Sequence, residues 1–181
     1  PPRPPPTRRT APHAPLDHPR PLPHQAAPAT FRSARARLLE YRSDQAGARR
    51  QDQPPRPEHF NWALDWFDVV ASTAETGPRT ALWVVDEDGT DTKATYEQMA
   101  SRSSQLASWL LSTGVKRGDR LLLMLGNQVE LWEMLLACCK LGAVVIPAST
   151  LISTEDGRER RERGKGAQVV TRSELAAKFS A

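Results

Sequence analysis

The stretch from Gly114 to Thr150 constrains the fold of this chain more than any other part of the sequence. Its first half holds residues 120–125, a continuous apolar run behind a single arginine, which is the pattern of a strand covered on both faces. Gly126 and Asn127 break the run and predict a tight turn at the carboxyl end of that strand. Because strands covered on both faces are typical of parallel sheets, this run favours an α/β fold.

The second half of the stretch predicts a helix and another strand. Residues 128–141 place apolar side chains at spacings of one, three and four, which predicts a largely buried helix. Gly142 suits the left-handed residue that ends a helix, and Lys140 lies in the last turn, where the helix dipole favours a cation. Residues 143–146 form a short strand that Pro147 closes. The whole stretch therefore predicts a βαβ crossover, a right-handed unit that belongs to a parallel sheet.

A helix is predicted near the start of the region that precedes the crossover. Pro57 suits its first position. One predicted core face holds Phe60, Leu64, Phe67 and Ala71. A neighbouring stripe holds Trp62, Trp66 and Val69. We interpret this stripe as core and docking surface, because helical spacing explains it without a box of aromatic rings that stack on a cofactor.

A hairpin and a second helix follow, and both have clear end signals. Residues 80–85 predict a strand, and Asp88-Gly89 predicts the turn to residues 90–95. Thr95 and Gln98 form a capping box at the start of a helix over residues 96–113. The predicted inner face of this helix holds Met99, Ser103, Leu106 and Leu110.

The end of the chain predicts one more step of the same sheet. A short helix over residues 155–163, capped by Ser153 or Thr154, leads to a strand over residues 168–171 and to a last helix. Gly157 and Arg161 depart from the pattern, because apolar residues are expected where they would face the sheet. A mid-helix glycine also costs about 1 kcal/mol relative to alanine.

The first residues differ in composition from the rest of the chain. Eleven of the sixteen prolines lie in the first 28 residues, so residues 1–30 are predicted to be a disordered Pro/Arg-rich tail. Three histidines there (His13, His18, His24) are interpreted as solvated, because no cysteine or carboxylate cluster accompanies them. Residues 31–56 predict a helical lead-in, and residues 57–181 a single subdomain. The apolar anchors of the lead-in are Phe31, Leu38, Leu39 and Tyr41.

Charge and composition exclude several classes of protein. Residues 1–56 hold eleven Lys/Arg against four Asp/Glu, a net charge of +7, whereas residues 57–181 hold fourteen against seventeen, a net charge of −3. The positive charge therefore belongs to the tail, which argues against nucleic acid as a partner of the folded part. No apolar run approaches the roughly 20 residues that span a bilayer, and the first residues lack the apolar segment of a secretory signal. The two cysteines are adjacent, so nothing indicates an oxidising compartment, and we expect a cytoplasmic protein.

Three short motifs look reactive but are interpreted as structural. Residues 72–79 hold one glycine, too few for backbone N–H groups to converge on a phosphate, and predict a surface turn. Residues 157–166 lack the spacing of a P-loop and predict a charged surface helix that runs into a turn. Cys138 and Cys139 with His59 are not predicted to act as nucleophile and base, because adjacent helical residues point apart and burial leaves a thiol inert. We therefore assign no catalytic, cofactor-binding or metal-binding residue. The Gly126-Asn127 turn lies at the carboxyl end of a strand, where open sheets tend to bind ligands, but we interpret it as a plain strand–helix connection.

The fixed residues of the crossover resemble a known family. In the N-terminal subdomain of the AMP-forming, adenylate-forming enzymes, and acyl-CoA synthetases in particular, the pattern is G-V-x-x-G-D-R-V, an apolar strand, a helix and then K-x-G-A-V-x-x-P. This chain matches it at Gly114, Val115, Gly118, Asp119, Arg120, Lys140, Gly142, Ala143 and Pro147. The resemblance covers roughly residues 31–179 and implies an α/β fold with a partial parallel sheet.

The resemblance implies an enzyme that joins a carboxylic acid to coenzyme A, as in fatty acid metabolism, with ATP, Mg²⁺ and CoA as cofactors and co-substrates. In the family, this chemistry belongs to a Gly/Ser/Thr-rich loop with a lysine, a Thr-Glu pair, an aspartate on the ribose and a lysine in a C-terminal domain. The sequence holds no counterpart of these motifs. We therefore expect a truncated subdomain that is inactive alone and has no cofactor of its own.

Two other functions remain as alternatives. The chain could be a non-enzymatic interaction module that binds a partner through exposed sheet and helix surface, and a homo-oligomer is left open. A dinucleotide-binding domain is disfavoured, because the sequence holds no G-x-G-x-x-G. Pyrophosphate release from ATP would separate the enzyme from the module.

Overall fold

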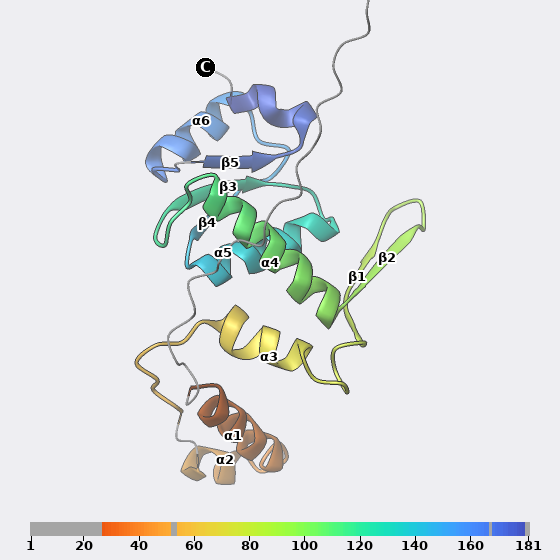
Figure 1. The fold of residues 1–181 in the computed structure, drawn as a ribbon, viewed down its shortest axis with the longest axis vertical. Coiled ribbons are helices and arrows are strands. Elements are labelled where there is room, and N and C mark those ends of the chain that lie inside the picture. Colours follow the sequence, from red (N-terminus) through yellow and green to blue (C-terminus); the bar gives the residue numbers. More distant parts are fainter. Residues whose placement is uncertain (1–26, 52–53, 167, 180–181) are drawn as a thin grey trace, which may run out of the picture.

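The computed structural model of the chain describes residues 27–51, 54–166 and 168–179 (Figure 1). The predicted disorder of residues 1–26 lies outside these described residues. Residues 27–30, which were also assigned to the tail, belong to the helix α1 (Ala27–Glu40). A turn separates α1 from the short helix α2 (Gln45–Gln51), so the lead-in consists of two helices.

The predicted crossover is present and belongs to a parallel sheet of three strands in the order β4-β3-β5. Strand β3 (Arg120–Met124) lies in the centre, between β4 (Val144–Pro147) and β5 (Gln168–Thr171). The helix α5 (Val129–Leu141) connects β3 to β4, and α6 (Thr154–Arg163) connects β4 to β5. The fold class and the parallel sheet predicted from the sequence are therefore confirmed.

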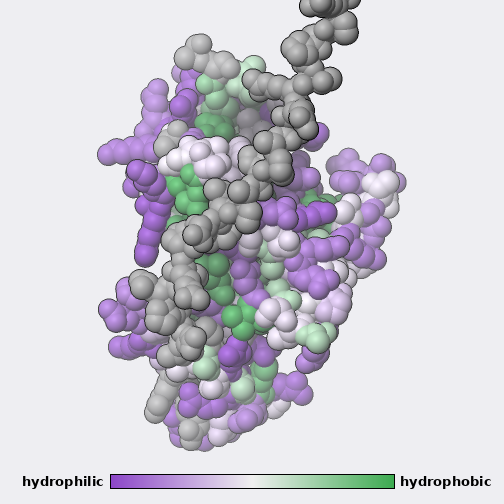
Figure 2. Space-filling model, viewed as in Figure 1, coloured by the Kyte–Doolittle hydropathy of each residue, from purple (hydrophilic) through white to green (hydrophobic). Residues whose placement is uncertain are grey.

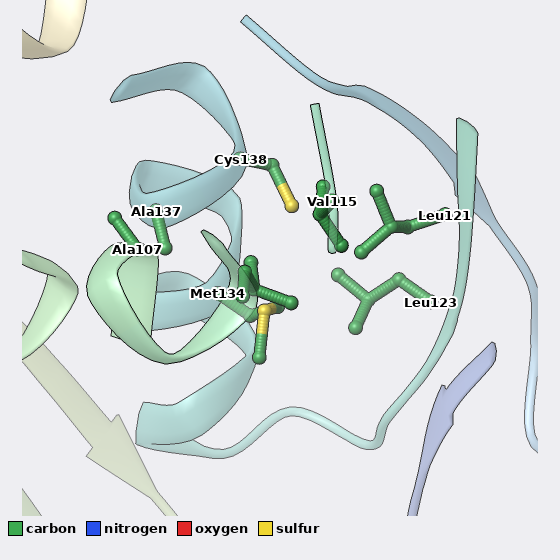
Figure 3. Close-up of a cluster of buried hydrophobic side chains, with 8 residues drawn as sticks. Ala107, Val115, Leu121, Leu123, Met134, Ala137 and Cys138 are labelled. Atoms are coloured by element: carbon green, nitrogen blue, oxygen red, sulfur yellow. The ribbon is translucent and has the colours of Figure 1, made fainter. Parts of the chain in front are cut away.

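The two faces of β3 are covered by different elements, because successive side chains of a strand point to opposite faces. Leu121 and Leu123 pack in a buried cluster with Met134 and Cys138 of α5 and with residues of α4 (Tyr96–Ser112), and Figure 3 shows the α5 side chains pointing toward the strand. Leu122 is fully buried on the other face.

The helix α6 lies on the face that Leu122 occupies. Ile146 is the register partner of Leu122 and shares its face. Gly164, at the end of α6, lies so close to Ile146 that a Cβ atom there would clash with its side chain. A side chain at Gly157 would press against the Phe179 ring at 3.1 Å, so this mid-helix glycine is explained by close packing.

The hairpin forms a separate antiparallel sheet of β1 (Thr80–Val85) and β2 (Asp91–Thr95), which projects from the body in Figure 1. Thr95 and Gln98 make the predicted capping box at the start of α4. A second buried cluster joins this hairpin to α4 and α5 and holds Val84, Ala94, Met99 and Leu136.

The helix predicted from Pro57 begins later than expected. Residues 54–61 are not helical; a π-helical segment, η1, spans Trp62–Phe67 and continues into α3 (Asp68–Ala71). Asn61 caps the start, because its side-chain oxygen accepts hydrogen bonds from the backbone N–H groups of Ala63 and Leu64. The predicted face is therefore partly wrong: Leu64 is exposed, and Ala63 is fully buried in its place.

The ends of the described chain pack on this body. Phe31 of α1 stacks on Phe60 with ring centroids 4.4 Å apart, which confirms that the lead-in packs on the fold. Leu38 and Leu39 are about half exposed, so their predicted role as anchors is wrong. After β5 the chain ends in a 3₁₀ segment, η2 (Ser173–Phe179), where the sequence predicted a helix.

Candidate functional site

The connections between the three parallel strands define where a ligand site is expected. From β3 the chain steps to one side through α5 to reach β4, and then crosses back through α6 to β5 on the other side. In open sheets of this kind, ligands bind in the crevice beyond the carboxyl ends of the strands where the direction reverses. That point lies between β3 and β5.

The turn after β3 supplies an amide side chain and the start of a helix. The Oδ1 atom of Asn127 accepts a hydrogen bond of 3.4 Å from the indole N–H of Trp132. Gln128 precedes α5 without a side-chain hydrogen bond to the helix start; its amide nitrogen donates to Glu130 at 3.0 Å. The Gly126-Asn127 turn is thus a strand–helix connection at the expected edge.

The loop after β4 is fixed by a lysine from the end of the chain. The Nζ of Lys178 donates hydrogen bonds of 2.8 Å to the backbone oxygens of Thr150 and Ile152. Between these two residues Leu151 projects outward and is 91% exposed. The loop therefore presents an apolar side chain on a backbone that Lys178 holds by two hydrogen bonds.

The end of β5 supplies a hydroxyl group. The Oγ1 atom of Thr171 is buried, and among the residues that the structure describes it has no hydrogen-bond partner. The next residue, Arg172, forms an ion pair with Glu174 at 2.7 Å. The accessible groups at this edge are therefore the Asn127 amide, the Arg172–Glu174 pair and backbone, which can bind and orient a ligand, whereas the Thr171 hydroxyl is buried.

Residues 72–79 form a tight turn whose backbone groups bond within the turn and to the start of α4. The N–H of Gly77 donates to the oxygen of Thr73 at 2.8 Å, and the oxygen of Gly77 accepts from the N–H of Glu97 at 3.1 Å. A Cβ atom at Gly77 would lie 2.7 Å from the oxygen of Ala71, so the glycine permits a close approach of two backbone segments. This geometry fits the predicted surface turn.

Residues 157–166 form the charged surface helix and turn that the sequence predicted. Most side chains of α6 are exposed, and Arg163 pairs with Glu159 at 2.9 Å. The hydrophilic side chains at the upper left of Figure 2 lie in the region of this helix.

The adjacent cysteines have different surroundings. Cys138 is 1% exposed in the core, and burial, with a smaller contribution from Cys139, raises the pKa of its thiol to about 11. Cys139 is partly buried and lines a cavity of about 540 Å³ together with His59. Its Sγ atom lies 3.8 Å from Oδ1 of Asn61. Cys138 is therefore a core residue, as predicted.

A buried ion pair that the sequence did not predict joins the 61–71 segment to α5. The side chain of Lys140 is 4% exposed, and its Nζ lies 2.8 Å from Oδ1 of Asp68. The same ammonium donates to the oxygen of Ala100 at 2.9 Å and to Oγ of Ser104 at 2.8 Å. Burial raises the pKa of Asp68 above its usual range, and the hydrogen bond and charge of Lys140 oppose that shift.

The only sequence signal for this ion pair was the position of Lys140 in the family pattern. The helix dipole explains a lysine in the last turn of α5 equally well, and gave no reason to expect burial.

Among the described residues there is neither a metal-binding cluster nor a membrane-spanning helix. Within those ranges, no group of three or more His, Cys, Asp or Glu side chains could hold a metal ion. None of the helices there is both long and apolar enough to cross a bilayer.

Comparisons with known proteins identify the family. A family model described as AMP-binding enzyme matches residues 69–177. The acyl-coenzyme A synthetase ACSM5, mitochondrial, of Rattus norvegicus is 35% identical over 126 residues, which are 67% of this chain and 22% of that protein. The chain belongs to the AMP-binding enzyme family, and the resemblance to acyl-CoA synthetases is confirmed.

Solved structures confirm the fold. The Brucella canis acyl-CoA synthetase matches with a TM-score of 0.61 at 24% identity, over 70% of this chain and 22% of that chain. The N-terminal subdomain of Klebsiella oxytoca NpsA matches with a TM-score of 0.51 at 25% identity, over 58% and 26% of the two chains. The chain thus has the fold of the N-terminal subdomain of adenylate-forming enzymes, and spans about a fifth of the length of the curated relatives that it matches.

Proposed function

We propose that this chain is the N-terminal part of an ATP-dependent acyl-CoA ligase. In the proposed reaction, a carboxylate oxygen attacks the α-phosphorus of ATP and pyrophosphate leaves, which gives an acyl-adenylate. The sulfur of CoA then attacks the acyl carbon, loses its proton, and AMP leaves, so the products are acyl-CoA, AMP and pyrophosphate. The observation that supports this proposal is the match of the family model to residues 69–177, which include the whole parallel sheet.

Within this ligase, we propose that the chain binds and positions a ligand without carrying the reacting groups. The edge beyond β3 and β5 offers the exposed side chain of Asn127 and the loop that Lys178 fixes. Mg²⁺ would normally shield the ATP phosphates, but the described residues offer no cluster of carboxylates to hold it. We infer that the groups that hold ATP and metal during the reaction belong to the part of the ligase outside this chain, and we expect the chain alone to be inactive.

Pyrophosphate release tests this proposal. Two proteins are compared: the chain of 181 residues, and the protein translated from the coding sequence read past codon 181. Each is incubated with ATP, Mg²⁺, CoA and a panel of short-chain, medium-chain and aromatic acids. We expect release that depends on the acid from the longer protein, and none from the chain alone. Turnover by the chain alone would overturn the proposal that the reacting groups lie outside this chain. A longer reading frame that lacks the Gly/Ser/Thr-rich loop would overturn the proposal that the protein is a ligase.

A second candidate function is a non-enzymatic interaction module. Several large apolar side chains are more than half exposed, among them Trp83, Trp109 and Leu151, and they would supply apolar contacts to a partner. A module predicts that the chain alone is monodisperse in analytical ultracentrifugation, as a monomer or a defined homo-oligomer. A subdomain that needs the rest of a ligase predicts concentration-dependent aggregation.

The cytoplasmic location stays a prediction. The relative named above carries the word mitochondrial in its name, so import into mitochondria is the competing outcome. A fluorescent fusion at the C-terminus, followed by microscopy and cell fractionation, separates the two.

A further inference from the structure

A cavity that the family assignment does not explain lies between α1, η1 and the turn that leads into β1. Its volume is about 730 Å³, within the usual range for small-molecule sites. Three arginines line it: Arg32 and Arg35 from α1, and Arg79 from the turn before β1. The cavity therefore gathers positive charge from two segments that are distant in the sequence.

Aromatic rings form one wall of this cavity. The ring centroids of Trp62 and Phe67 lie 5.7 Å apart, and those of Phe67 and Tyr96 lie 5.5 Å apart, so the three rings form a continuous row. Trp66 also lines the cavity, and the guanidinium carbon of Arg35 lies 5.9 Å from its ring centroid. Rings arranged in this way offer apolar faces on which a planar group can stack.

Contacts on both sides of the cavity hold the backbone segments that carry the arginines. The stacking of Phe31 on Phe60 anchors α1 beside the cavity, and Arg32 and Arg35 lie three residues apart, on one face of the helix. On the other side, the backbone oxygen of Arg79 accepts a hydrogen bond of 3.1 Å from the N–H of Tyr96. Both sources of charge are thus tied to the elements that carry the rings.

The charge of the lining is not neutralised internally. Three arginines and Glu75 give a net charge of +2. Within the ranges that the structure describes, none of the three arginines forms an ion pair with a carboxylate. A guanidinium group binds phosphate through two parallel hydrogen bonds, and a phosphate monoester carries a charge of about −1.5 to −2 at neutral pH. The charge of the lining and that of a single phosphate monoester are therefore complementary.

We propose that this cavity binds a small phosphorylated ligand with a planar heterocycle, of the nucleoside monophosphate class. The arginines pair with the phosphate, and the aromatic row receives the ring. The inference rests on the lining of the cavity and not on the proposed ligase function, so either can fail while the other stands.

Isothermal titration calorimetry of the chain of 181 residues tests the proposal with AMP, adenosine, inorganic phosphate and benzoate as probes. We expect AMP to bind more tightly than adenosine or phosphate, because neither of these has both the ring and the charge. Arg35→Gln and Arg79→Gln should each weaken AMP binding about tenfold, the size of one charge-assisted hydrogen-bond pair. Arg37→Gln is the matched control, since Arg37 lies on α1 but does not line the cavity.

The indole N–H signals of the five tryptophans give an independent readout by NMR, each assigned by a Trp→Phe variant. AMP should shift the signals of Trp62 and Trp66 and leave those of Trp83 and Trp109 in place. Equal weakening by Arg37→Gln and Arg35→Gln would overturn the proposal, because it indicates attraction to net charge alone. Unmoved signals of Trp62 and Trp66 would also overturn it, as would benzoate binding as tightly as AMP.

Discussion

The strand β3 of the crossover and the segment at residues 61–71 pack against the same helix, α5, by different physical means. The crossover buries apolar side chains on both faces of β3, and Leu121 and Leu122 are 1% and 0% exposed. The 61–71 segment is held by polar bonds: Asn61 donates its side-chain N–H to the oxygens of Cys139 and Lys140, at 2.8 and 3.2 Å. Beside them, Lys140 pairs with Asp68.

This difference separates two kinds of information in the sequence. Apolar burial is encoded locally, because its period shows which face of a strand or helix is covered. A hydrogen bond between residues 78 positions apart has no local period, and depends on the folded arrangement of both segments. Substitutions in the two regions should therefore differ in how they can be rescued.

The largest effect is expected in the crossover. Leu121→Ala leaves a cavity in the cluster around β3, and should lower the free energy of unfolding by about 2–5 kcal/mol. Urea denaturation followed by circular dichroism measures this change. Leu151→Ala is the matched control, since its side chain is 91% exposed and the change should be within about 0.5 kcal/mol. Similar losses for the two variants would show that the cluster does not support the fold.

Removing one partner of the buried ion pair should have the next largest effect. Lys140→Met leaves the carboxylate of Asp68 without its cation, and should cost about 2–4 kcal/mol, toward the lower end because the Asp68 side chain is 26% exposed. The double variant Lys140→Met/Asp68→Leu should recover most of the loss, because it leaves no unpaired charge.

Arg163→Met controls for the loss of a cation at a helix end. Its pair with Glu159 is exposed, and should contribute no more than about 0.5 kcal/mol. A double variant as unstable as Lys140→Met would contradict this account of the 61–71 segment and point to lost packing of the lysine chain.

Asn61 tests the same segment with a smaller change. Asn61→Ala removes a cap and two long-range bonds, and should cost about 1–2 kcal/mol, more than Thr95→Ala, which removes a local cap only. Asn61→Asp keeps the accepting oxygen but cannot donate to the carbonyls of α5, so its stability in urea should lie below that of the native chain. Equal stability of Asn61→Asp and the native chain would show that the long-range bonds contribute nothing.

The elements that were predicted correctly are those with local signals. The apolar run before Gly126, the periodic helix after it and the capping box at Thr95 are all present within a residue or so of the expected bounds. The prediction that a helix starts at Pro57 is wrong, because the preference of proline for the first helical position is weaker than the cap and the long-range hydrogen bonds that Asn61 makes.

The candidate site was less predictable than the fold. The Gly126-Asn127 turn was identified at a strand end, but the loop clamped by Lys178 depends on a residue 26 positions from its acceptor. The arginine-lined cavity joins α1 to a turn more than forty residues later, and neither segment carries a motif. Tertiary packing alone brings these groups together.

The smallest expected effect is the pH dependence of the stability that Asp68 contributes. It also gives the sharpest comparison with an ordinary surface ion pair. Burial raises the pKa of Asp68 in the folded state above its ordinary value of 3.8, so the folded chain binds this proton more tightly than the unfolded chain. The stabilisation from that proton is complete below the unfolded pKa, and is lost as the pH rises through the folded pKa. The loss of unfolding free energy in Asp68→Asn should therefore be larger at pH 4 than at pH 7, as measured by urea denaturation at both values.

An ordinary ion pair behaves in the opposite way, because acid removes the charge of its carboxylate and with it the stabilisation. A cost that shrinks on acidification would show that attraction to Lys140, rather than burial, dominates the energy of this carboxylate.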